Sequence, residues 1–228
     1  MTPLDALVLV HRGGAALERT LASVAWAQRR YFLDPAGVLA AADWPAGVER
    51  WPGSGAAGWV LLLSEGETAG KELRVVLEST PDDGTTARRL VIECHAFGGV
   101  IRGRPRVRLC RGQCTVRASL GGGVEFAVRE RAPVLPGAAI AHVLPPLPAE
   151  AVDALNAEAR TLAALAAAHG QRPRFVRLLT GGLVGATGLL FGKGTGRLGW
   201  GRWIVAVLAG YRALLAEAKL WERAQLGA

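Results

Sequence analysis

The fold is decided in residues 4–35, LDALVLVHRGGAALERTLASVAWAQRRYFLDP. Residues 4–10 form an apolar run with β-branched side chains, which is typical of a fully buried strand. Apolar residues then recur at three- and four-residue steps over residues 15–27 and predict a helix with one core-facing side. Residues 31–33 predict a second strand, which ends at Asp34. This strand-helix-strand order favours a right-handed parallel crossover, the building unit of nucleotide-binding α/β sheets.

The next buried strand brings acidic residues to the edge of the same sheet. Residues 59–63, WVLLL, predict a third strand that runs into Ser64-Glu65-Gly66-Glu67. Ligand groups in open α/β sheets gather at the carboxyl ends of strands. We therefore expect Asp34, Glu65 and Glu67 at the edge of the sheet where a binding site would lie.

The remaining sequence divides the chain into two regions. Apolar and β-branched segments between residues 88 and 142 predict several strands, and residues 148–169 predict an Ala-rich helix that stops at a glycine. We expect an α/β domain over residues 1–145 and a C-terminal helical region over residues 146–228. The individual segments expected after residue 63 are a helix at 69–78 and strands at 89–95, 100–110, 113–119 and 124–128.

The C-terminal region contains two uncharged runs, residues 178–192 and 203–211. Both are shorter than the roughly 20 apolar residues that a membrane-spanning helix needs. Tryptophan and arginine stand beside them, and these are the side chains that an interfacial helix offers to the lipid headgroup layer. Two interpretations stay open: the helices pack on the domain, or they lie on an anionic membrane surface.

The chain is basic, because 27 Lys and Arg against 19 Asp and Glu give a net charge of +8. Such a balance suits nucleic acid, anionic lipid or a phosphorylated small molecule as the partner. Arg102, Arg104, Arg106 and Arg108 alternate, so in one strand their guanidinium groups share a face that is either solvated or a phosphate-binding track. No helix-turn-helix, zinc-finger or aromatic ribonucleoprotein signature accompanies the charge, so nucleic acid is not expected as a partner.

Cysteine is sparse, at Cys94, Cys110 and Cys114. Cys94-His95 combined with the other two fits no standard zinc spacing, so we expect small buried apolar thiols and predict no metal site. The first residues show no basic segment that leads into an apolar stretch with a cleavage site. We therefore expect a cytoplasmic protein, which the interfacial interpretation of the tail would place peripherally on the inner face of the cytoplasmic membrane.

Several segments occur in an order that resembles a known family. They are residues 7–10, the helix at 17–27, Phe32-Leu33-Asp34, the strand at 59–63, and YRALLAEAKLWE at 211–222. Together they are similar to the family 2 glycosyltransferases, in particular to the branch that adds sugars to the lipopolysaccharide core. The resemblance implies a nucleotide-sugar-binding (GT-A-like) α/β fold, with a mostly parallel sheet flanked by helices and a C-terminal helical extension.

The resemblance also implies a nucleotide-binding site at Asp34, Ser64 and Gly66. In the family the residue at the position of Asp34 contacts the base or ribose, and the two aspartates of the D-x-D motif correspond to Ser64 and Gly66 here. The second aspartate helps to hold a divalent cation that neutralises the diphosphate leaving group. Serine alone is a poor magnesium ligand and glycine has no side chain, so Mg or Mn is expected only if the protein is active. Glu65 and Glu67 are the candidate substitutes, although successive strand positions point to opposite faces.

Glu125 is the candidate catalytic residue that the resemblance implies. In the same branch a His-Glu pair precedes a strand that ends in His, and Val124-Glu125 and His142 stand at the corresponding places. A carboxylate there could take the proton from the acceptor hydroxyl as it attacks. The alternative is a surface carboxylate paired with Arg117 or Arg129, with His142 in a structural role.

These features predict a family 2 glycosyltransferase-like protein of cell-envelope glycan assembly of the lipopolysaccharide type, with weakened or lost metal-dependent sugar transfer. An active enzyme would move a hexosyl or heptosyl group from a nucleotide-sugar donor to a lipid-linked or lipopolysaccharide-like acceptor. The alternative hypothesis is a non-catalytic scaffold or binding module that keeps the glycosyltransferase fold.

Overall fold

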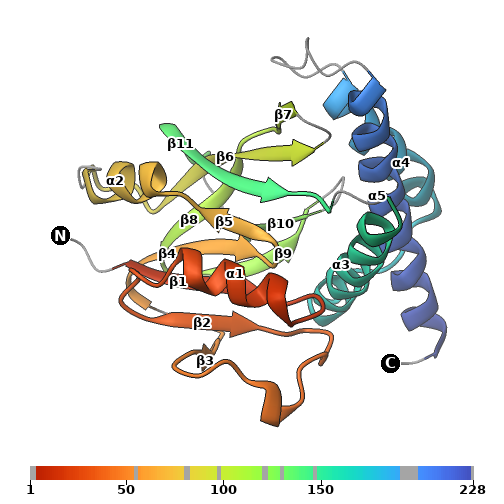
Figure 1. Cartoon of the computed structure of the whole chain (residues 1–228). Helices are drawn as coiled ribbons and strands as arrows, with labels where there is room; N and C mark the ends of the chain where they lie inside the picture. The colour runs from red at the N-terminus through yellow and green to blue at the C-terminus, as the bar shows by residue number, and fades with distance from the viewer. Residues whose placement is uncertain are drawn as a thin grey trace. The chain divides into compact units, whose positions relative to one another are not determined.

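The computed structural model describes residues 4–53, 56–79, 83–96, 99–119, 123–128, 131–145, 148–190 and 200–226, which form an α/β fold as the sequence predicts (Figure 1). The elements up to residue 79 are β1 (Leu4–Leu9), α1 (Ala15–Ser23), β2 (Arg30–Leu33), the 3-10 turn η1 (Ala41–Asp43), β3 (Glu49–Arg50), β4 (Ala56–Ser64), β5 (Glu67–Ala69) and α2 (Lys71–Ser79). The later elements are β6 (Ala87–Ala96), β7 (Gly99–Arg102), β8 (Arg106–Gly112), β9 (Thr115–Ala118), β10 (Val124–Ala127), β11 (Val134–Val143), α3 (Pro148–Ala168), α4 (Phe175–Leu190) and α5 (Trp200–Leu226).

The strand β1 lies at the centre of the parallel part of the sheet. It pairs in parallel with β2 on one side, in the register Leu9↔Leu33, and with β4 on the other, in the register Leu9↔Ser64. The parallel pairing predicted for the strand-helix-strand unit is therefore confirmed. Because the carboxyl ends of parallel strands meet at one edge, the residues that follow β1, β2 and β4 are brought together there.

On the outer side of β2, β3 also pairs in parallel, in the register Phe32↔Arg50, whereas the other pairs with a defined register are antiparallel. β8 pairs antiparallel with both β4 and β6, and β5 pairs antiparallel with β11. Within the described residues the strand order is β3-β2-β1-β4-β8-β6-β11-β5, with β7 on β6, and β9 and β10 form a separate two-stranded sheet. The expected α/β architecture holds, and the sheet is mixed.

A hydrophobic core forms where α1 packs on the sheet. Val8 of β1 and Leu61 of β4 are fully buried and belong to one cluster with Leu17 and Leu21 of α1. The helix is shorter than the predicted 15–27, because it ends at Ser23 and the chain turns, with the indole N–H of Trp26 donating to the Ser23 carbonyl at 2.8 Å. The apolar periodicity thus locates the helix but extends it one turn beyond its observed end at Ser23.

The predicted strand at residues 100–110 is wrong, because the chain forms two strands, β7 and β8, separated by residues 103–105. Pro105 cannot donate to a ladder of hydrogen bonds and Gly103 weakens a strand, which explains the break. The four alternating arginines therefore do not share one strand face. Arg102 is exposed, whereas Arg108 is 1% exposed.

The chain divides into two compact units. The first comprises Met1–Glu93, Arg104–Val116 and Glu125–His142, and the second Cys94–Gly103, Arg117–Val124 and Val143–Ala228. In the second unit α5 packs on α3, where Leu220 is buried with Ala163 and Ala166, and Arg212 forms an ion pair of 3.0 Å with Glu158. Among the described residues no helix is both long and apolar enough to cross a membrane.

Candidate functional site

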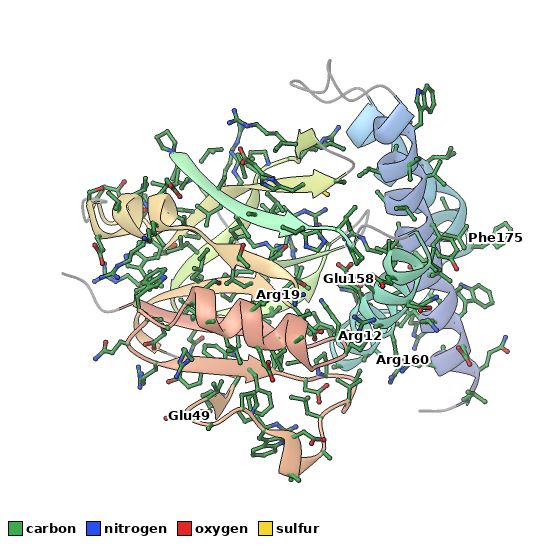
Figure 2. The ribbon with its side chains drawn as sticks, viewed as in Figure 1. Arg12, Arg19, Glu49, Glu158, Arg160 and Phe175 are labelled. Atoms are coloured by element: carbon green, nitrogen blue, oxygen red, sulfur yellow. The ribbon has the colours of Figure 1, made fainter. Side chains whose placement is uncertain are left out.

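The loop after β1 aims three consecutive backbone N–H groups at a single carboxylate. The amides of His11, Arg12 and Gly13 donate to Oε2 of Glu65 at 2.7, 2.9 and 3.0 Å, and Figure 2 labels Arg12 in this loop. Gly13 has φ of 80°, a left-handed conformation that L side chains rarely adopt, and it lets the chain curl around the acceptor. Such a concave run of amides is an anion-binding nest. Glu65 is only 8% exposed, and its own N–H donates to the carbonyl of Leu9 at 2.9 Å. The side chain of Glu65 therefore occupies the nest.

Ser64, at the end of β4, is held by two neighbours. Its hydroxyl lies 2.7 Å from Nε2 of His11, and its N–H donates to Oε2 of Glu67 at 2.7 Å. Ser64 is 4% exposed. Its side chain is therefore a buried partner of His11, and it is not presented to solvent.

Glu67 forms a buried ion pair with Arg108 of β8. Oε1 of Glu67 accepts a hydrogen bond from Nη2 of Arg108 at 2.8 Å, and both side chains are at most 5% exposed. Nη1 of Arg108 also donates to the carbonyl of Leu62 at 3.4 Å. Since the other carboxylate oxygen of Glu67 holds the amide of Ser64, both oxygens are engaged.

Gly66 occupies a turn between β4 and β5. Its φ is 89°, and its N–H donates to the hydroxyl of Thr20, a fully buried residue of α1, at 2.9 Å. A Cβ at this position would lie 3.7 Å from Cε1 of His142, which is paired with Glu67 in the β11–β5 register. His142 therefore stands beside the turn, and Gly66 contributes only backbone.

Asp34 follows β2 and organises its own loop. Its Oδ1 accepts from the N–H of Val38 at 3.0 Å and its Oδ2 accepts from the N–H of Leu39 at 2.9 Å. Asp34 follows β2 and Ser64 ends β4, and these two strands flank β1 on opposite sides, which separates the two residues by roughly 10 Å, two strand spacings. The structure thus brings Asp34, Ser64 and Gly66 to one edge of the sheet.

Glu125 lies on a strand of the smaller sheet. It is half-buried on β10, in the two-stranded sheet with β9, whereas the three predicted nucleotide-binding residues follow or end strands of the large sheet. Its assignment as the catalytic base stays a prediction.

The amides of His11 to Gly13 and the side chain of Arg108 are parts of this site that were not predicted from the sequence. Two consecutive glycines after a buried strand are a signal for unusual backbone conformation, and both Gly13 and Gly14 have positive φ. Nothing in the sequence around Arg108 marks it as buried, because its burial depends on the pairing of β8 between β4 and β6.

The donor atoms at this edge do not fit the Mg or Mn ion that an active transferase would need. Hard cations take several oxygen ligands in a fixed geometry. Ser64 is bonded to His11, Gly66 has no side chain, and both oxygens of Glu67 and Oε2 of Glu65 already accept hydrogen bonds. Over the described ranges, moreover, no group of three His, Cys, Asp or Glu residues could hold a metal ion.

The three cysteines are free thiols that lie in two places. Burial raises the pKa of Cys94, in the second unit, to about 11. Cys110 and Cys114 lie in the first unit, where the hydrogen bond between their thiols lowers the pKa of Cys110 and raises that of Cys114. Cys110 and Cys114 are buried, whereas Cys94 is half-buried.

No family model matches the chain, and no curated protein matches it. The functional assignment consequently depends on the geometry of the sheet edge and on the resemblance in sequence.

Proposed function

We propose that this chain keeps a glycosyltransferase-like fold without metal-dependent sugar transfer and acts in cell-envelope glycan assembly as a non-catalytic binding or scaffold module. The carrying observation is the Glu65 carboxylate inside the nest of His11, Arg12 and Gly13. The order of β1, β2 and β4 supports the family resemblance, since it creates the sheet edge at which nucleotides bind in α/β folds.

A diphosphate could use this edge only if Glu65 left it. Moving the Glu65 side chain out of the nest would break its three hydrogen bonds, and hydrogen bonds to a carboxylate are stronger than those between neutral groups. If Glu65 stayed, a phosphate about 4 Å away would meet a repulsion of about 4 kcal/mol at the effective dielectric constant near a protein surface. No cation ligand set is free at Ser64, Gly66 or Glu67 to offset that repulsion.

Calorimetric titration of the full chain with uridine, guanosine and ADP-heptose-type sugar nucleotides, with manganese or magnesium present, tests the proposal. We expect no metal-dependent binding. Tight binding that requires the metal would overturn the proposal and would restore the active transferase.

A transfer assay with the same donors gives a second test that uses Glu125. Sugar transfer by the purified protein that is abolished in Glu125→Gln would contradict a non-catalytic role. Glu49→Gln is the matched control, because Glu49 is an exposed carboxylate of β3 in the same unit, labelled in Figure 2.

A further inference from the structure

The helices α4 and α5 of the second unit expose large apolar side chains. On α5 the side chains of Trp203, Val207, Leu214 and Trp221 recur at steps of four and seven residues, which places them on one face. Trp203 is 56% and Val207 65% exposed. On α4 the exposed apolar side chains are Phe175, Val176 and Leu183, and Figure 2 shows Phe175 pointing away from the helices.

The two helices approach each other closely at glycine positions. A Cβ on Gly210 of α5 would lie 2.8 Å from the carbonyl oxygen of Gly182 on α4, and a Cβ on Gly182 would lie 3.3 Å from the oxygen of Gly210. The backbones are therefore in direct contact. Leu214, next to this seam, remains 42% exposed.

The exposed threonines of α4 donate hydrogen bonds from their hydroxyl groups to backbone carbonyls of the same helix. Thr180 donates to the carbonyl of Val176 and Thr187 to that of Leu183, each at 2.7 Å. An apolar environment requires each polar hydrogen to have a partner within the segment. Only one charged residue, Arg177, occurs in α4.

The same region carries most of the net charge of the chain. Residues 171–228 contain nine Lys and Arg and two Glu, a balance of +7 out of the total of +8. A segment with this net positive charge and an exposed apolar face that carries tryptophan complements a surface that is apolar beneath and anionic on top.

We propose that the exposed face of α4 and α5 binds the surface of an anionic lipid bilayer. The apolar stripes enter the boundary between headgroups and acyl chains, and the basic residues contact lipid phosphates. A second copy of the chain is the less suitable occupant, because residues 171–228 of each copy carry a net charge of +7 and would repel one another. The proposed bilayer-binding surface is formed by α4 and α5 alone, and the Glu65 nest is not part of it.

Flotation of the full chain with phosphatidylcholine vesicles, with and without phosphatidylglycerol, tests the proposal. We expect co-flotation only with the anionic vesicles, weakening as salt rises because charge attraction is screened. The double variant Trp203→Ser/Val207→Ser should lower the vesicle partition coefficient by about tenfold or more, since it removes large apolar side chains from the buried face.

The matched control is Trp44→Ser/Val75→Ser in the first unit, where Trp44 is 46% and Val75 62% exposed. This variant should float like the unaltered protein, and circular dichroism should show that both variants keep their helices. Equal flotation of the two variants, or binding that ignores phosphatidylglycerol, would overturn the proposal. The proposal would also be overturned if the protein did not float and light scattering showed a dimer that dissociates only in Trp203→Ser/Val207→Ser.

Discussion

At the scale of single residues, Glu65 decides what the edge of the sheet can bind. We expect Glu65→Ala to lower the free energy of unfolding by about 2–4 kcal/mol, because three amides lose a charged acceptor in a buried place. Inorganic phosphate should then raise the unfolding midpoint of the variant above that in chloride at equal ionic strength, since the vacated nest accepts an anion. Urea unfolding monitored by fluorescence measures both effects.

The control for this change is Glu49→Ala, which removes an exposed carboxylate from the same unit. It should change stability by less than about 0.5 kcal/mol and confer no response to phosphate. If Glu65→Ala were as stable as the unaltered protein, the nest would not be a structural feature of the fold in solution.

Arg108 and Glu67 allow a second test at the residue scale. Arg108→Met leaves the Glu67 carboxylate buried without its cation, and we expect a loss of about 3–5 kcal/mol. Glu67→Gln in the same chain should restore part of that loss, because the amide oxygen can still accept from Ser64 while no charge stays buried. A double-mutant cycle by urea unfolding measures the coupling. Additive effects of the two changes would contradict the ion pair.

At the scale of elements, the sequence predicts those helices and strands that have a local periodic pattern of apolar residues. The buried run of β1 and the apolar repeat of α1 are local patterns, and the parallel pairing with β2 follows from them. The burial of Arg108 could not be predicted, because it depends on the pairing of β8 between β4 and β6, which alternation along residues 100–110 does not encode. The capture of Glu65 depends on contacts between residues more than 50 positions apart, which no local pattern encodes.

The packing of α4 on α5 gives a prediction at the same scale. Gly210→Ala puts a methyl group 2.8 Å from a backbone oxygen, so the helices must separate, and we expect a destabilisation of about 1–3 kcal/mol. Gly181→Ala is the matched control, because its Cβ would lie 3.9 Å from that of Ala213, an ordinary contact. The control should stabilise the protein by up to about 1 kcal/mol through helix propensity. Thermal unfolding followed by circular dichroism compares the two, and a stabilising Gly210→Ala would contradict the close seam.

At the scale of the whole molecule, the two units are interleaved along the chain. The boundaries after Glu93, Val116, Val124 and His142 fall inside β6, β9, β10 and β11, so single strands belong to both units. When one end of such a strand unfolds, the hydrogen-bonded ladder at its other end is shortened and weakened. We therefore expect the unfolding of the two units to be coupled. The chain is thus expected to unfold as one cooperative body in spite of its division into two units.

This coupling is testable with the variants already described. We expect Glu65→Ala in the first unit and Gly210→Ala in the second to shift one common unfolding transition, because each removes stability from the same cooperative body. Coincident urea curves from tryptophan fluorescence and far-ultraviolet circular dichroism would show a single transition. If instead the curves separated, with Glu65→Ala moving one step and Gly210→Ala the other, the units would unfold independently. The shared strands would then connect the two units without coupling their unfolding.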